Sequence, residues 1–393
     1  MRIASRMTDI GTETAFEAAA RARALEAEGR SIIHLEIGEP DFDTPANVRE
    51  AAKRAIDDGW THYGPPLGLP ELREAIAADA SARKGFPASA DRVVVTPGAK
   101  PIMYYAMLAL VEPGDEVIVP DPGFPIYASM AAWAGGTVVP LPIRQAHEFR
   151  LDLDELASLI TPRTRLLVIN SPANPTGGVF TRDDIERIAE LVLRHDLVVL
   201  ADEIYGRILY DGTEHVSIAS LPGMAERTIV LDGFSKTWAM TGWRLGYGIL
   251  PEPLLEPFSR LIINSVSCTA TFSQLAAVEA LQGPQDAVEA MIAEFRARRD
   301  LVVEGLNRIP GIHCLQPEGA FYVFPDVSAT GLGAAELAHR LLNDAGVCVL
   351  AGSAFGQVGR DHLRISYANS RENLGRALEA IGGLVERLAA ASA

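Results

Sequence analysis

Apolar and polar residues follow different patterns in different parts of the chain. Between residues 90 and 250, short apolar runs alternate with longer segments that carry an apolar residue at every third or fourth position. The runs are typical of β-strands and the longer segments of amphipathic helices. Several runs are continuous rather than alternating, as expected for a mostly parallel sheet that is covered on both faces. We therefore predict an α/β fold with a doubly wound sheet. Its strands are expected over residues 93–96, 116–120, 137–142, 165–170, 197–202, 228–232 and 245–250.

The regions on either side of this part have other patterns. Residues 1–30 look like an arm that leads into a helix ended by Gly29, and a short apolar strand follows. Helices are predicted next over residues 46–58 and 69–85. After Pro251 the pattern predicts three helices, four short strands and a final helix from Glu372. These helices are expected over residues 253–265, 270–282 and 285–309, and the strands over residues 312–316, 321–325, 347–350 and 363–367.

These changes divide the chain into three parts. Residues 1–45 are expected to form an N-terminal arm and a segment that packs on a small domain. Residues 46–285 form the large domain, and residues 286–393 form a smaller α+β domain. With 393 residues, the chain is long enough for two or three domains with substantial cores.

Charge and cysteine content narrow the classes of function. The 51 acidic residues outnumber the 35 basic ones, which gives a net charge of −16. This acidity argues against nucleic acid or an anionic membrane as the main partner, although a local basic pocket could still bind a small anion. No apolar run is long enough to span a bilayer, and residues 1–30 lack the apolar stretch of a signal peptide. Cys268, Cys314 and Cys348 are far apart and are interpreted as reduced thiols, so a cytoplasmic enzyme is expected.

One lysine lies in an unusual setting. Lys236 is flanked by small, aromatic and hydroxyl residues, and the nearest cation in the sequence is Arg244. Burial and a neighbouring guanidinium both disfavour the ammonium form, so this lysine is poised to lose its proton. A neutral amine is what a Schiff base requires. A structural lysine that extends from a loop to solvent fits this stretch equally well.

Other polar residues follow the predicted strands. Ligands of α/β sheets bind beyond the carboxyl ends of the strands. Gly98 and Ala99 follow the first strand and open a helix, where free backbone N–H groups can hold a phosphate. The later strands lead to an amide, a carboxylate, a phenol and the lysine. Each signal is weak alone, because an aspartate at a strand end is more often a cap, but together they place reactive groups on one edge of one sheet.

Segments at these strand ends and elsewhere in the chain resemble the aspartate aminotransferase family (class I/II, fold type I), whose members use pyridoxal 5′-phosphate (PLP). The strongest matches are Asn174-Pro175-Thr176-Gly177, Asp202-Glu203-Ile204-Tyr205, Ser235-Lys236 and Met240-Thr241-Gly242-Trp243-Arg244. The resemblance continues, in the family's order, at Gly38-Glu39-Pro40-Asp41-Phe42, Tyr63, Gly98-Ala99-Lys100, Gly319-Ala320-Phe321-Tyr322 and Arg364-Ile365-Ser366-Tyr367-Ala368.

The resemblance implies roles around the cofactor. Lys236 would form the Schiff base with PLP and then act as general base and acid on the substrate's α-proton. Asp202 would keep the pyridine nitrogen protonated, which makes the ring a stronger electron sink. Tyr205 and Asn174 would hydrogen-bond the phenolic oxygen. The remaining implied cofactor residues are Gly98, Ala99, Ser235 and Arg244 at the phosphate, Lys100 beside them, Phe124 stacked on the ring, and Tyr63, which would reach the phosphate from a partner subunit in a homodimer.

Other positions bear on the substrate. Arg364 would bind the α-carboxylate as a bidentate fork, and Gly38 and Asn174 would line the pocket. Lys100 would contact the distal carboxylate of a dicarboxylic substrate if it points inward, and a solvated lysine in a first helical turn is an equal alternative. Gly233 stands where many relatives carry a phosphate-binding serine, and Phe124 replaces a common Trp or Tyr, which keeps the stacking and removes a polar group.

The predicted function is an aminotransferase that moves an amino group between an L-amino acid and a 2-oxo acid by a ping-pong mechanism. Lys100 favours aspartate and glutamate. A second hypothesis keeps PLP and changes the reaction to that of a β-lyase, a decarboxylase, a γ-replacement synthase or an oxidase. A PLP-binding regulatory domain is disfavoured, because the sequence begins almost directly at the arm. The eight histidines lack ligand spacing, so no metal is predicted.

Overall fold

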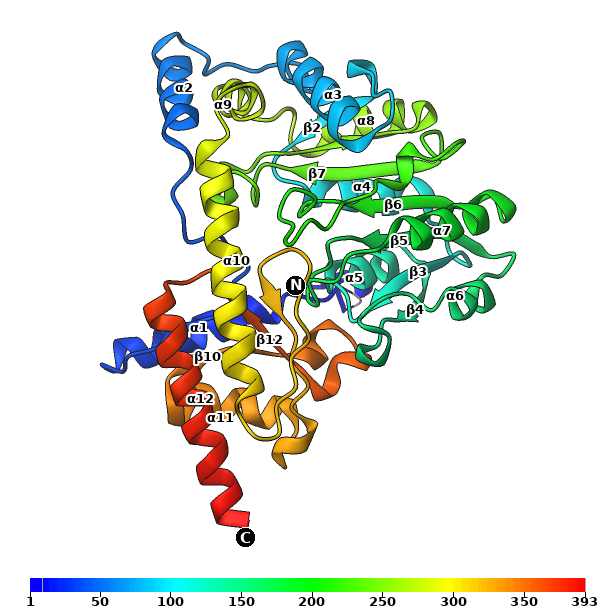
Figure 1. Cartoon of the computed structure of the whole chain (residues 1–393). Helices are drawn as coiled ribbons and strands as arrows, with labels where there is room; N and C mark the ends of the chain where they lie inside the picture. The colour runs from blue at the N-terminus through cyan, green and yellow to red at the C-terminus, as the bar shows by residue number, and fades with distance from the viewer. Residues whose placement is uncertain (9, 393) are drawn as a thin grey trace.

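The computed structural model describes residues 1–8 and 10–392. Its largest feature is a seven-stranded sheet in the order β2-β8-β7-β6-β5-β3-β4 (Figure 1). The five strands from β7 to β4 are parallel, and β8 is antiparallel to β7 and to β2. All seven strands predicted from the apolar runs are confirmed, and each end lies within one residue of the prediction. The strands are β2 (Val93–Thr96), β3 (Glu116–Asp121), β4 (Thr137–Pro142), β5 (Thr164–Asn170), β6 (Val198–Asp202), β7 (Thr228–Gly233) and β8 (Gly246–Ile249).

The large sheet is covered by helices on both faces, as the continuous apolar runs predict. In β5, Leu166 and Val168 pack with α4, α5 and α8, whereas Leu167 and Ile169 pack with α6 and α7 on the opposite face. Side chains alternate across a strand, so a strand buried on both faces is apolar at every position. The helices of this part are α2 (Ala46–Asp57), α3 (Pro70–Lys84), α4 (Lys100–Leu110), α5 (Ile126–Trp133), α6 (Leu153–Leu159), α7 (Arg182–Arg194), α8 (Leu255–Ser265) and α9 (Thr271–Gln282).

Helix ends follow local chemistry. α7 begins with a capping box, in which the Thr181 side chain accepts from the Asp184 N–H and the Asp184 carboxylate accepts from the Thr181 N–H. This arrangement satisfies N–H groups that have no partner within the helix. α3 ends at Gly85, whose φ of 75° lies in the left-handed region that glycine adopts without strain.

A second group of elements forms two small sheets beside the large one (Figure 1). β1 (Ile33–His34) pairs in parallel with β10 (Val347–Cys348). β12 (Leu363–Ser366) lies between β11 (Leu350–Ala351) and β9 (Tyr322–Val323), antiparallel to both. The helices here are α1 (Thr14–Ala27), α10 (Asp286–Asn307), α11 (Ala334–Ala345) and α12 (Arg371–Ser392). α10 begins beside α9 and runs down to α12, so this long helix connects the two groups (Figure 1).

Two predictions in this region are wrong. Residues 312–316 form no strand and contribute one isolated bridge, between His313 and Asp326. The Asn307 side chain takes the place of a neighbouring strand, because its amide donates to the Cys314 carbonyl and its oxygen accepts from the Cys314 N–H. The strand expected over residues 347–350 is divided into β10 and β11, which pair with different partners in different sheets.

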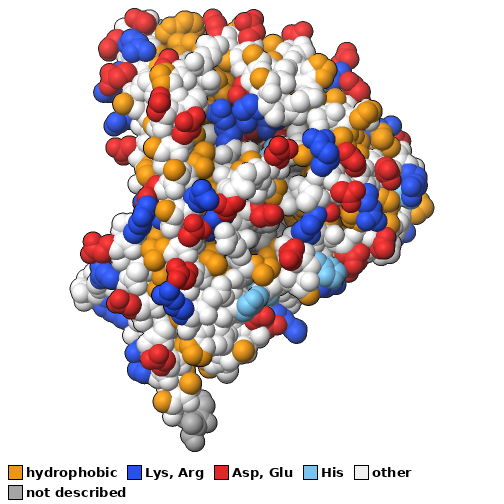
Figure 2. Space-filling model, in the orientation of Figure 1, with side chains coloured by type: hydrophobic (Ala, Val, Ile, Leu, Met, Phe, Trp, Pro, Cys, Tyr) orange, Lys and Arg blue, Asp and Glu red, His pale blue; other side chains and the backbone are white. Residues whose placement is uncertain are grey.

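Charged side chains are spread over the surface. On the face seen in Figure 2, acidic and basic groups are interspersed, so the net charge of −16 is not gathered into one patch there. Within residues 1–8 and 10–392, no helix combines the length and the apolar character needed to cross a membrane.

Candidate active site

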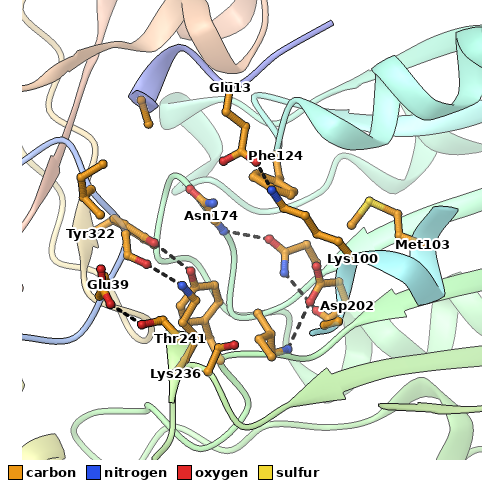
Figure 3. Close-up of a pocket in the computed structure, with 18 of the residues that line it drawn as sticks. Glu13, Glu39, Lys100, Met103, Phe124, Asn174, Asp202, Lys236, Thr241 and Tyr322 are labelled. Atoms are coloured by element: carbon orange, nitrogen blue, oxygen red, sulfur yellow. Dashed lines mark hydrogen bonds and ion pairs between the residues drawn. The ribbon is translucent and has the colours of Figure 1, made fainter. Parts of the chain in front are cut away.

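The candidate residues meet at one edge of the large sheet. β5, β6 and β7 are adjacent and parallel, and Asn170 at the end of β5 lies in register with Asp202 at the end of β6. The loops that leave these strand ends surround a cavity of about 450 Å³ (Figure 3). The structure brings together all the sequence-predicted site residues except Gly98 and Tyr63 along its lining. These lining residues are Gly38, Ala99, Lys100, Phe124, Asn174, Asp202, Tyr205, Ser235, Lys236, Arg244 and Arg364.

Lys236 follows β7, and its amine lies inside the cavity. The Nζ atom donates a hydrogen bond to the Gly38 carbonyl at 2.5 Å. Burial lowers the pKa of this amine from 10.5 to about 8, against an opposing contribution from the Glu39 carboxylate. The guanidinium that helps to lower it is that of Arg364, whereas the sequence pointed to Arg244. At neutral pH a pKa near 8 leaves roughly a tenth of the amines neutral, several hundred times more than in a solvated lysine.

Asp202 ends β6 and is almost fully buried. One carboxylate oxygen accepts from the Tyr127 hydroxyl at 2.6 Å and the other from the Ile204 N–H at 3.2 Å. Burial, reinforced by the Asp232 and Glu203 carboxylates, raises the pKa of Asp202 from 3.8 to about 6. Sequence reasoning missed Tyr127, although its place after β3 indicates that it can reach the same edge of the sheet. Above about pH 6, Asp202 therefore presents a buried negative charge to the cavity.

Asparagine side chains fix the loops around this carboxylate. Asn170 accepts from the Asn174 N–H at 2.8 Å and donates to the Asp202 carbonyl at 3.0 Å.

Two tyrosine hydroxyls form a further pair in the site: those of Tyr205 and Tyr322 lie 2.8 Å apart. Tyr322 belongs to one of the segments that resemble the family, but the resemblance implied no role for it. It also explains Gly38, since a Cβ there would lie 2.0 Å from the Tyr322 hydroxyl oxygen.

Arg364 brings a buried cation from β12 into the cavity. Its Nη1 donates to the Asn174 Oδ1 at 3.3 Å and its Nη2 donates to the Glu36 carbonyl. The guanidinium lies 4.7 Å from the Tyr322 ring centre and 4.9 Å from that of Phe355. Its Nε has no partner, and no carboxylate of the described residues forms an ion pair with it. A buried guanidinium held only by neutral groups is a site for a carboxylate.

A second anion seat lies where α4 begins. Gly98 has a φ of 80°, and a Cβ there would lie 2.2 Å from Nη2 of Arg244. Any larger residue would therefore push the guanidinium away from the start of the helix. Ser235 and Ala99 line the same cavity as Arg244, which is itself held by a 2.8 Å hydrogen bond to the Thr241 carbonyl. A guanidinium, a hydroxyl and a helix N-terminus together suit a phosphate group.

Lys100 lines the cavity together with a carboxylate that neutralises its charge. Its amine forms an ion pair with the Glu13 carboxylate and lies 5.5 Å from the Phe124 ring centre (Figure 3). The sequence predicted either a contact of Lys100 with the distal carboxylate of the substrate or a solvated lysine, and neither prediction included Glu13. Tyr63 lies apart from the cavity, and the residue is 90% exposed in the single chain.

A buried ion network lies behind Asp202. The Lys84 amine is 2.6 Å from the Glu203 carboxylate and 2.8 Å from the Asp232 carboxylate. The Ser217 hydroxyl donates to Glu203 at 2.6 Å, and Asp232 accepts from the Gly233 N–H at 2.7 Å. The sequence missed this network, because nothing in the pattern at the end of α3 distinguishes Lys84 from a surface lysine.

Comparison with known proteins places the whole arrangement in a family. Residues 30–381 match the family described as aminotransferase class I and II. An aspartate aminotransferase from Pyrococcus abyssi is 45% identical over 358 residues, which cover 90% of this chain and 92% of the relative. An aromatic-amino-acid aminotransferase from Thermococcus litoralis is 45% identical over 351 residues, covering 88% and 90%. The crystal structure of an aspartate aminotransferase from Rhizobium meliloti has a TM-score of 0.94 at 40% identity and covers 98% of this chain and 99% of that one.

Proposed function

The chain belongs to the class I and II aminotransferases, and we propose that it binds PLP at Lys236 and uses the cavity at the sheet edge for both substrates of a transamination. The chain is an aminotransferase, and PLP is the cofactor of its family. The observation that carries the proposal for this chain is the cavity amine of Lys236, whose pKa is lowered to about 8 within the pocket that Asp202 also lines.

The residues present fit this cofactor. Lys236 would hold its carbonyl carbon, Asp202 its ring nitrogen, and Ser235, Arg244 and the start of α4 its phosphate. The backbone at Gly98 leaves no room for a Cβ beside Arg244, as a close approach to a phosphate requires. When bound, PLP supplies an electrophilic carbon for amines and a ring that accepts electrons from the substrate's Cα.

Each protein group then has a defined task. Arg364 binds the α-carboxylate through its Nη atoms and its unpartnered Nε. The neutral Nζ of Lys236 takes the α-proton of the amino acid and returns a proton in the reverse half-reaction. Asp202, ionised above about pH 6, would stabilise a positive charge on the ring nitrogen of the cofactor, and Tyr127 holds that carboxylate in place. The amino donor and the oxo acceptor use the same site in turn, which is a ping-pong cycle.

Aspartate and glutamate are the first candidate donors. The relative from Pyrococcus abyssi is named for aspartate, and Lys100 offers a cation for a second carboxylate. The relative from Thermococcus litoralis is named for aromatic amino acids, and Phe124, Met103 and Ile37 give this cavity an apolar lining. The transaminase names of these relatives disfavour the lyase, decarboxylase, synthase and oxidase alternatives.

We also propose that the active unit is a cytoplasmic homodimer. The exposed Tyr63 is a side chain that a partner subunit's cavity could receive, as the family resemblance implies. Three free cysteines suit a reducing compartment. Residues 46–285 would form the large PLP-binding domain, residues 286–393 the small domain, and residues 1–45 the arm and the segment that packs on it.

A half-reaction screen tests the function. The purified protein, loaded with PLP, is mixed with single L-amino acids, and loss of its visible absorbance is followed together with release of the 2-oxo acid. Conversion by at least one amino acid is expected, and Lys236→Ala should lack both the wild-type absorbance and turnover. A wild-type protein that stays colourless with PLP would refute the cofactor. Loss of absorbance with release of ammonia and no aminated cofactor would refute transamination.

A further inference from the structure

We propose that Glu13 is a specificity-determining residue that competes with the substrate for Lys100 and thereby lowers the preference of the cavity for dicarboxylic amino acids over those with uncharged side chains. This inference rests on the proposed function, since it concerns the substrate of the same cavity.

Glu13 is directed into the cavity by its place in the chain. It is the residue before α1, the position whose side chain usually accepts from the first N–H groups of a helix. The Glu13 carboxylate makes no such hydrogen bond. It reaches Lys100 instead, and its side chain is only 17% exposed (Figure 3). The arm is held nearby, because the Gly11 N–H donates to the Ser129 hydroxyl on α5 at 2.7 Å.

The other three cations that line the cavity have different roles in the proposed function. Arg364 suits the α-carboxylate, Arg244 lies at the phosphate seat and Lys236 is the amine that reacts. Lys100 is therefore the one lining cation of the described residues that is left for a substrate side chain. Glu13 occupies it, so the side-chain end of the cavity is neutral.

This neutral end has different consequences for two classes of substrate. An acidic side chain must displace Glu13 from Lys100 and then lie beside the displaced Glu13 carboxylate, which also lines the cavity. An aromatic or aliphatic side chain leaves the ion pair intact and meets apolar neighbours, including Phe16 from α1 and Met103 from α4.

The ion pair is weak enough to exchange. Lys100 is 48% exposed, and partly exposed pairs of this kind change an equilibrium by a factor of about five or less. Glu13 therefore shifts the preference between the two classes and does not exclude either.

The test compares four proteins loaded with PLP: wild type, Glu13→Gln, Lys100→Met and the double variant. For each, kcat/KM is measured with L-aspartate and L-phenylalanine, and the Kd is measured with succinate and 3-phenylpropanoate, which bind without reacting. In Glu13→Gln we expect kcat/KM for aspartate to rise about five-fold and the Kd of succinate to fall similarly, with the phenylalanine and phenylpropanoate values unchanged within two-fold. The double variant should show no such gain. Glu17→Gln is the matched control, because Glu17 lies one turn further along α1, exposed and outside the cavity lining.

An aspartate-to-phenylalanine ratio that is the same in wild type and Glu13→Gln would overturn the proposal, and so would an equal gain in the protein that lacks Lys100. Failure of the proposed function looks different. In that case no amino acid reacts with any of the four proteins, whereas the succinate Kd still reports whether Glu13 competes for Lys100.

Discussion

The buried carboxylate of Asp202 is expected to make the cofactor-free protein less stable as the pH rises. A pKa raised from 3.8 to about 6 means that ionising Asp202 in the folded state costs about 3 kcal/mol more than in the unfolded chain. Below pH 3.8 both states are protonated and there is no cost. The cost then grows as pH rises toward 6 and is complete above it. It amounts to about 1.5 kcal/mol at pH 5 and about 3 kcal/mol at pH 8.

Asp202→Asn removes this titration from both states. In this variant the amide oxygen can accept from the Ile204 N–H and the NH2 group can donate to the Tyr127 hydroxyl oxygen, so any cost of the exchange is the same at every pH. The free energy of unfolding of Asp202→Asn, relative to wild type, should therefore increase by about 1.5 kcal/mol between pH 5 and pH 8. The assay is urea unfolding of both cofactor-free proteins at one protein concentration. PLP affinity and turnover should fall in the same variant.

Asp154→Asn provides the control, because the Asp154 side chain is 97% exposed. Its stability relative to wild type should not change over this pH range. If the difference between Asp202→Asn and wild type were also the same at pH 5 and pH 8, the carboxylate would not be ionising at a cost, and the electrostatic argument for its role would fail.

Three further substitutions probe other parts of the site. Lys84→Met leaves the buried Asp232 carboxylate without its ion-pair partner and Glu203 with only the His215 imidazole, 3.1 Å away. It should lower the free energy of unfolding, measured with urea, by about 3–5 kcal/mol, whereas the exposed Lys53→Met should change it by less than about 0.5 kcal/mol. Equal effects of the two would show that the network is not stabilising. Arg364→Leu should lower kcat/KM for amino acids about 100-fold and leave the visible absorbance with PLP unchanged, and retained activity would remove Arg364 from the substrate site. Tyr63→Ala should weaken PLP binding, and co-expression with Lys236→Ala should restore activity, because one mixed site then has both residues intact. No recovery in the mixed dimer would mean that Tyr63 does not serve the partner's cavity.

The sequence predicted the large sheet well and the small ones less well. A strand such as β5 is buried on both faces, so its own residues mark it as a strand. Residues 347–350 are equally apolar, but the division between β10 and β11 depends on two different partner strands that are distant in the sequence. Residues 312–316 fail as a strand for a related reason, because a side chain from α10 takes the backbone hydrogen bonds.

The same distinction applies to the site. The lysine, the carboxylate and the amide follow strands of one sheet, so their meeting could be inferred from strand order alone. The contacts of Glu13 with Lys100 and of Lys84 with Glu203 could not, since they join residues 87 and 119 positions apart. The guanidinium that lowers the pKa of Lys236 was misassigned for this reason as well. Arg244 is near in sequence, whereas Arg364 arrives from the small sheet.

The network of Lys84, Glu203 and Asp232 limits how this chain can diverge. A neutral residue at position 84 would leave two buried negative charges next to the strand end that carries Asp202. A neutral residue in place of either carboxylate would leave Lys84 with one negative charge instead of two. Neutral drift at one of these positions is therefore expected to stall until a second one changes with it. Descendants should carry either the full set of charges or a set that has lost cation and anion together, and position 84, far from the chemistry in sequence, should covary with position 232.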